Sequence, residues 1–115
     1  MQYLVMIYAS EAEENKMTAE ETGQMLQAYG AYMQALSAAG VLKASNRLRP
    51  ATDAASVRVR KGKTEVLNGP FAETREQLGG FVLIDVPDLD AALSWAARCP
   101  SSSMGTIEVR PIWEM

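Results

Sequence analysis

The segment from Asn68 to Leu89 combines clustered charge with residues that favour special backbone conformations, so it is where chemistry is most expected. It opens with the turn sequence Asn68-Gly69-Pro70-Phe71. In a cleft wall, the Asn68 amide could hydrogen-bond a small polar ligand. The alternative is a purely structural turn anchored by Phe71, because asparagine and glycine tolerate positive φ at turns. We predict these four residues as ligand-binding.

The next residues form a short charged loop that offers both an acid and a cation. Thr74 and Arg75 could contact a polar or anionic ligand, and we add them to the predicted ligand-binding residues. Glu73 and Glu76 are the carboxylates that could act as a general base near the cleft. The alternative is a solvated loop or a local salt bridge, which would contribute only about 0–1 kcal/mol. The sequence therefore leaves the catalytic residues open.

A second group of charges alternates with apolar residues on two predicted strands. Arg58 and Arg60 lie on one strand, and Glu108 and Arg110 lie on the other. If this face lies inside an assembly, Arg58 and Arg110 would bind a carboxylate or phosphate with two parallel hydrogen bonds. If the face lies in water, these are ordinary solvent-exposed residues.

The chain contains no histidine and one cysteine, Cys99. Ser-His-Asp and Cys-His catalysis are thereby excluded, and a zinc site is not expected because, apart from Cys99, only oxygen ligands remain. Cys99 falls near the end of an apolar helical pattern, so we predict a buried small hydrophobic residue. The acidic residues between 11 and 21 show no EF-hand spacing and are typical of a solvated loop and a helix start. We expect no metal and no cofactor.

The amino-acid composition limits the kinds of binding partner and the cellular location that we expect for this protein. A net charge of −3 argues against nucleic acid, which usually needs a basic face. No apolar run approaches the ~20 residues of a membrane helix. The apolar run from Tyr3 to Ala9 lacks the basic flank of a signal peptide, so we interpret it as a first strand and expect a cytoplasmic location.

Hydrophobic periodicity predicts the elements that position these residues. Strand Tyr3–Ala9 is apolar on both faces, which is typical of a strand covered on both sides. Helix Thr18–Ala39 starts at a capping box of Thr18 and Glu21 and ends before Gly40. Its buried stripe is predicted as Leu26, Tyr29, Met33 and Leu36, with Gly23 and Gly30 allowing close packing on the sheet.

The second half of the chain repeats this pattern after a hairpin. The predicted elements are strand Val41–Leu48, hairpin Ser56–Leu67 with a turn at Lys61-Gly62-Lys63, strand Phe81–Val86 opened by Gly79-Gly80, a helix capped by Asp88 and stopped by Pro100, and strand Thr106–Trp113. The second helix should bury Leu89, Ala92, Leu93 and Ala96. Ser10–Met17 and Ser101–Gly105 are predicted as loops.

The order strand, helix, strand, hairpin, strand, helix, strand predicts a single domain over residues 1–115 with an α+β, ferredoxin-like fold. Two βαβ units share one sheet, and right-handed crossovers place both helices on the same face. The other face remains apolar and needs a cover. A second copy, with two sheets about 10 Å apart, would provide it. We therefore predict a homodimer of the dimeric α/β-barrel type.

Several stretches, in this order and spacing, resemble the YCII-related family, in the branch called DGPF-domain proteins. They are MQYLVMIY, AYGAYMQALSAAGVL, VRVRKGKTEVLNGPFAETREQLGGFVLIDVPDLDAALSWAARCP and GTIEVRPIWEM. The resemblance implies a ferredoxin-like fold, a dimeric barrel and a cleft near the Asp-Gly-Pro-Phe loop. Asn68 stands where the branch name expects aspartate. The histidine and aspartate proposed as the wider family's catalytic pair cannot be transferred, because this chain has no histidine.

Three functional hypotheses follow. The first is a non-catalytic homodimer that binds a small anionic or polar molecule or serves in regulation. Some relatives occur beside or fused to alternative sigma factors, which suggests a regulatory role by analogy. The second is a cofactor-independent isomerase or lyase that acts on a small cyclic or aromatic acid with a carboxylate base. The third is a purely structural or assembly role.

Overall fold

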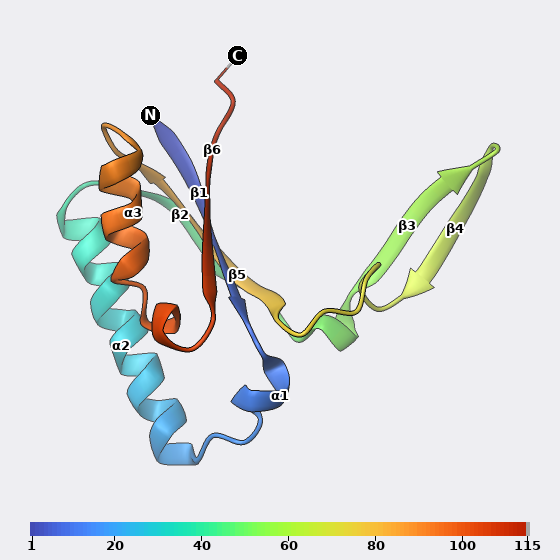
Figure 1. The fold of residues 1–115 in the computed structure, drawn as a ribbon, viewed down its shortest axis with the longest axis horizontal. Helices are drawn as coiled ribbons and strands as arrows, with labels where there is room; N and C mark the ends of the chain where they lie inside the picture. The colour runs from blue at the N-terminus through green and yellow to red at the C-terminus, as the bar shows by residue number, and fades with distance from the viewer. Residues whose placement is uncertain (115) are drawn as a thin grey trace.

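The protein has a two-layer body and a hairpin that projects from it (Figure 1). The structure is a computed structural model and describes residues 1–114. In the body, two long helices cover one face of a four-stranded sheet. The hairpin stands out on the side of the sheet opposite the helices.

The elements, in chain order, are β1 Gln2–Ala9, α1 Glu11–Glu14, α2 Ala19–Ala38, β2 Leu42–Arg47, the 3-10 turn η1 Ala51–Asp53, β3 Ala55–Arg60, β4 Lys63–Asn68, β5 Gln77–Asp85, α3 Leu89–Ala97, the 3-10 turn η2 Pro100–Ser103 and β6 Thr106–Pro111. The sheet order is β2-β5-β1-β6, and each neighbouring pair is antiparallel. Helices α2 and α3 each connect two strands separated by one other strand. This mixed α+β arrangement is compatible with a ferredoxin-like fold, as the sequence predicts.

The core lies between the sheet and the two helices. Alternate residues of β1, namely Tyr3, Val5 and Ile7, are buried on the helix side. Val82 and Ile84 of β5 lie beside them in register, and Leu36 is the most deeply buried residue of α2. Cys99 belongs to the same cluster and is 1% exposed, which confirms its predicted role as a buried hydrophobic residue.

The helices bury less of their predicted stripes than expected. Leu26 is 54% exposed, because the N-terminal half of α2 extends past the end of the sheet (Figure 1). In α3, Leu89 and Leu93 are exposed, and the buried positions are the small residues Ala92 and Ala96.

The predicted role of Gly23 and Gly30 in close packing is also wrong. Both residues are exposed, and a Cβ atom at either position would meet nothing within 4 Å. These glycines therefore weaken α2 without a packing reason.

Several predicted segments also differ from the structure; the predicted loop Ser101–Gly105, for example, contains part of the 3-10 turn η2. The predicted loop after β1 contains α1, because the Ser10 side chain accepts a hydrogen bond from the Glu13 N–H and caps it. Strand β5 begins at Gln77, so Gly79 and Gly80 lie inside the strand and do not precede it. Gly80 lies close to β2, because a Cβ atom on it would be 3.0 Å from the Asn46 carbonyl oxygen. Strand β6 ends at Pro111, two residues before the predicted end, although the Ile112 N–H still donates to the Gln2 carbonyl at 2.9 Å.

The hairpin of β3 and β4 follows the sequence prediction closely. Its two-residue turn is Lys61-Gly62, and both residues have positive φ, 52° and 75°. Such turns match the twist of paired strands. The register pairs Val57 with Val66 and Arg58 with Glu65, so the two pairs lie on opposite faces.

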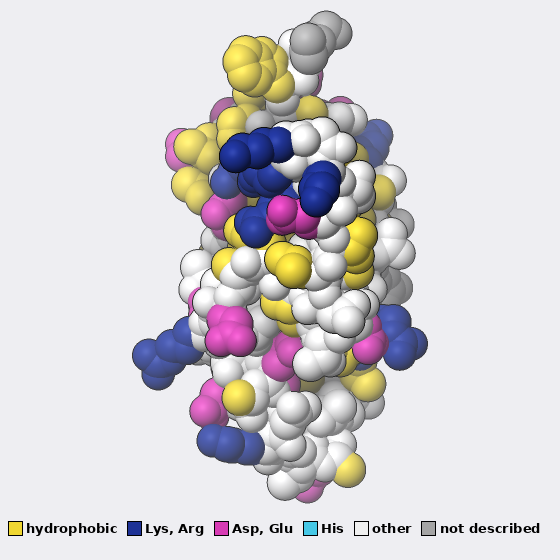
Figure 2. Space-filling view, turned by 90° about the vertical axis from the view of Figure 1, so that its right-hand side faces the viewer, with side chains coloured by type: hydrophobic (Ala, Val, Ile, Leu, Met, Phe, Trp, Pro, Cys, Tyr) yellow, Lys and Arg dark blue, Asp and Glu magenta, His cyan; other side chains and the backbone are white. Residues whose placement is uncertain are grey.

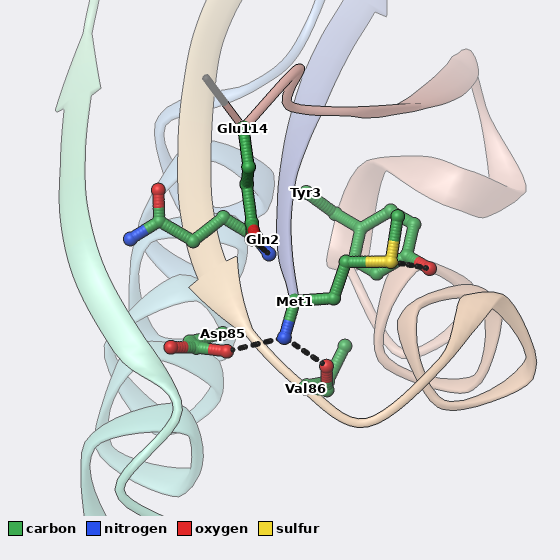
Figure 3. Close-up of polar contacts among 6 residues, drawn as sticks. All are labelled: Met1, Gln2, Tyr3, Asp85, Val86 and Glu114. Carbon is green, nitrogen blue, oxygen red and sulfur yellow. Dashed lines mark hydrogen bonds and ion pairs between the residues drawn. The ribbon is translucent and has the colours of Figure 1, made fainter.

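The start of β1 is tied to the end of β5 (Figure 3). The Met1 ammonium donates to Asp85 Oδ1 at 2.9 Å and to the Val86 carbonyl at 3.0 Å. The Asp85 hydrogen bond raises the pKa of the ammonium, and the same bond lowers the pKa of Asp85. The Tyr3 hydroxyl donates to Met1 Sδ at 3.4 Å.

Candidate functional site

An open polar hollow lies where β1 ends and β6 begins. We call it the loop hollow. Its volume is about 820 Å³. It is lined by Tyr8, Ser10, Glu13, Thr74, Arg75, Glu76, Met104, Thr106 and Glu108. These residues come from the sheet, from α1 and its cap, from the loop before β5, and from the end of η2.

The antiparallel register brings the sheet residues together. Tyr8 of β1 is the partner of Thr106 of β6, and Met6 is the partner of Glu108. Thr106 and Glu108 therefore share with Tyr8 the sheet face opposite α2 and α3 (Figure 1). This face continues from the hollow along the sheet.

Hydrogen bonds hold the loop before β5 against the body. The Thr106 hydroxyl donates to Glu76 Oε1 at 2.8 Å, and the Gln77 side-chain amide donates to the Thr74 carbonyl at 2.6 Å. Gln77 Oε1 also accepts from the Glu11 N–H at 2.9 Å. This network positions Thr74 and Glu76 on one wall of the hollow.

The charges of the hollow leave one cation available. Glu108 accepts from Arg110 at 2.8 Å, and Glu13 pairs with Lys16 at 3.4 Å. Within residues 1–114, no ion pair involves Arg75. A ligand anion could therefore approach Arg75 without displacing an internal carboxylate.

The structure brings together only part of the predicted ligand-binding set. Thr74 and Arg75 line the loop hollow, and Arg110 lies beside it through its pair with Glu108. Arg58 lies on the hairpin and pairs with Glu65 at 2.8 Å. Of the two candidate carboxylates, Glu76 lines the hollow and Glu73 does not.

The turn Asn68-Gly69-Pro70-Phe71 lies at the base of the hairpin and does not line the loop hollow. Its backbone closes the hairpin: the Gly69 N–H donates to the Ala54 carbonyl at 2.6 Å, and the Ser56 hydroxyl donates to the Gly69 carbonyl at 2.9 Å. Gly69 adopts φ 94°, which suits glycine. Phe71 is 89% exposed, so it does not anchor the turn within this chain. Ligand binding by these residues stays a prediction.

Six lining residues were not among the predicted catalytic or ligand-binding residues: Tyr8, Ser10, Glu13, Met104, Thr106 and Glu108. The order of strands in the predicted sheet could have indicated some of these residues. In the predicted sheet, the end of the first strand and the start of the last strand meet at one edge, so residues there could have been grouped.

A second hollow, the helix groove, lies between α2 and the segment after α3. Its volume is about 660 Å³. It is lined by Met17, Glu21, Gln24, Met25, Ala28, Ala31, Tyr32, Arg98, Pro100 and Met104. Burial raises the pKa of Tyr32, whose hydroxyl donates to the Trp95 carbonyl at 2.9 Å. A tyrosine base would need a lowered pKa, so Tyr32 does not suit that role.

Two further findings concern residues 1–114. No helix there is long and apolar enough to cross a membrane. In the same residues, no three acidic or cysteine side chains gather in a way that could hold a metal ion.

The antiparallel α+β fold with two helices on one face defines the structural class, and comparison with known proteins defines the family. The chain belongs to the YCII-related domain family, whose model matches residues 1–115. An uncharacterized protein of Rhizobium meliloti (strain 1021) is 40% identical over 114 residues, which cover 97% of this chain and 92% of the relative. The YCII-related part of the sequence prediction is therefore confirmed.

Proposed function

We propose that this YCII-related protein is a non-catalytic homodimer of the DGPF branch that binds a small anionic molecule in the loop hollow, in the cytoplasm. The observation that carries the proposal is Arg75, a cation without an internal ion-pair partner within residues 1–114, at the wall of a polar hollow. The absence of histidine favours binding over catalysis.

The lining chemistry supports a ligand with an anionic group and several polar groups. Arg75 can bind a carboxylate or phosphate with two parallel hydrogen bonds. The hydroxyls of Ser10, Thr74 and Thr106 line the same hollow and can hydrogen-bond neutral polar groups. Because Glu76 and Glu108 repel further anions, we infer a ligand with a single carboxylate or phosphate.

The uncovered sheet face supports the dimer. Leu4 and Met6 of β1 and Phe81 and Leu83 of β5 lie on it and are only half-buried. Helices α2 and α3 lie on the other face of the sheet (Figure 1), so within residues 1–114 neither of them covers this face. Packing of this apolar stripe on the same stripe of a second copy would remove both from water, as in face-to-face sheets.

A thermal-shift screen of small carboxylates, phosphates and aromatic acids tests the ligand. A compound that binds only the folded state at 100 times its Kd adds about 2.7 kcal/mol, roughly a 10 °C rise in Tm for a domain of this size. We expect such a compound to be found, and we expect Arg75→Gln to abolish its effect. Arg49→Gln is the matched control, because Arg49 lies outside the hollow and pairs with Asp53.

Two results would contradict the proposal. One is that no compound raises Tm, which would leave a structural role. The other is a monomer at micromolar concentration in sedimentation experiments, because the uncovered apolar face would then have no partner.

One observation favours a catalytic alternative, a cofactor-independent isomerase or lyase with a carboxylate base. Glu76 is the candidate base that lines the hollow. If an active substrate is found, Glu76→Gln should lower turnover by at least about 100-fold, and Glu73→Gln should leave it unchanged. Full activity of Glu76→Gln would exclude this mechanism.

A further inference from the structure

The β3–β4 hairpin has an apolar face that this chain leaves in water. We call residues Ala55–Asn68 the arm. Val57 and Val66 are cross-strand partners, and Val59 lies two residues along on the same face. Their exposures are 68%, 65% and 59%. A two-stranded hairpin without a third strand or a packed helix is marginally stable in water, so this face needs a cover.

The overall dimensions indicate that the cover lies outside this chain. The radius of gyration is 16.1 Å, whereas a compact domain of this length has about 13 Å. The excess arises because the arm stands away from the body instead of folding back on it (Figure 1).

The distribution of charge along the chain indicates which molecule covers the valine face of the arm. The arm carries four cations, Arg58, Arg60, Lys61 and Lys63, and one carboxylate, Glu65. The rest of the chain therefore holds seven cations and thirteen carboxylates. Figure 2 views the molecule from the side of the arm and shows one group of Lys and Arg side chains in the upper part of this face, while others lie singly nearer its edges. The arm therefore has a net charge of +3, and the rest of the chain, the body, has a net charge of −6. The arm of one copy is thus attracted to the body of another copy.

We propose that the arm of each copy packs its valine face on the acidic body of a second copy of this chain. This inference rests on the homodimer proposed above and adds its means of attachment. Two arms would repel each other through their cations, so contact with the body is favoured over contact between arms. The cations sit at the tip and on the opposite face of a single-layer hairpin. From there they attract the body over about 8 Å, the Debye length at physiological ionic strength.

The arm also connects to the loop hollow. Strand β4 ends at Asn68, and the chain then continues through the turn to Thr74, Arg75 and Glu76 on the hollow wall. Attachment of the arm to a second copy holds both ends of this loop, since its other end is already fixed by β5. The dimer thereby preorganises the segment that carries Arg75.

Two neighbouring substitutions on β4 test the contact. Val66 lies on the valine face, and Leu67 lies on the opposite face and is also exposed. We expect Val66→Ser, and more strongly Val57→Ser with Val66→Ser, to raise the dimer Kd by at least about tenfold in sedimentation equilibrium. Leu67→Ser removes a larger apolar side chain and should change the Kd by less than about threefold. Equal effects of Val66→Ser and Leu67→Ser would overturn the proposal.

Hydrogen exchange of the unmodified protein provides a second test that needs no variant. Amides of residues 55–68 should be protected at concentrations where the dimer forms and should exchange rapidly after dilution to monomer. A dimer whose arm amides remain unprotected would overturn the arm contact and leave the proposed dimer intact. A monomer at all concentrations would overturn the dimer itself.

Discussion

Gly105 lies at a point where the backbone of β1 leaves no room for a side chain. A Cβ atom at this position would lie 2.1 Å from the Tyr8 carbonyl oxygen and 3.2 Å from the Ala9 Cα. Real Cβ atoms essentially never approach closer than 3.0 Å, so Gly105→Ala requires the two backbones to separate by about 1 Å. The obstacle is main chain in a paired strand, which cannot rotate away.

We expect Gly105→Ala to lower the free energy of unfolding by about 2 kcal/mol. Overpacking costs up to about 3 kcal/mol where the neighbours cannot move easily. Alanine recovers up to about 1 kcal/mol by restricting the unfolded chain. The corresponding fall in Tm is roughly 8 °C for a domain of this size.

Gly23→Ala and Gly30→Ala are matched controls with the opposite expected sign. Both positions lie inside α2, and an added Cβ would meet nothing within 4 Å. Each substitution should therefore raise the free energy of unfolding by about 1 kcal/mol. The three variants are compared by urea denaturation at one fixed protein concentration, because association makes apparent stability concentration-dependent. A Gly105→Ala variant as stable as the unmodified protein would refute the steric argument.

Three other predictions concern the body. Leu36→Ala should cost about 2–5 kcal/mol in urea denaturation, because Leu36 is fully buried and its loss leaves a cavity. Thr18→Ala should cost about 1 kcal/mol in the same assay, because the Thr18 hydroxyl accepts from the Glu21 N–H at 3.1 Å and caps α2. Asp85→Asn should lower Tm most between about pH 4 and pH 8, where both partners of the ion pair are charged. The pKa of Asp85 is lowered in the folded protein, so the stability contributed by its carboxylate is lost as pH falls. The pKa of the Met1 ammonium is raised, so the stability contributed by the ammonium is lost as pH rises. A Tm difference for Asp85→Asn that persists unchanged at pH 10 would exclude the ion pair as its cause.

The elements could be predicted where local chemistry and periodicity agree. The capping box at Thr18 and Glu21 is formed as predicted, and Gly40 ends α2 with φ 74°. The hairpin turn at Lys61-Gly62 follows from the same kind of local rule. These features depend on residues within a few positions of one another, so the sequence alone contains the needed information.

Local patterns could not predict which helix residues are buried or which residues line the loop hollow. Leu26 continues the apolar periodicity of α2 but is exposed, because periodicity does not reveal where the sheet ends. Thr74 and Arg75 were predicted from local charge, whereas Tyr8 and Thr106 join them only through the pairing of β1 with β6. Such neighbours depend on strand order, which lies beyond local sequence patterns.

The burial of Cys99 gives the protein a native reporter of conformational opening. Cys99 is the only cysteine, and its thiol lies 3.4 Å from the Tyr29 hydroxyl inside the core. A thiol-specific reagent should therefore label the chain only when the core opens, and the labelling rate then measures how often it does so. Any second cysteine introduced on the surface would react far sooner, so spectroscopic probes can be attached at chosen positions without first removing the native thiol.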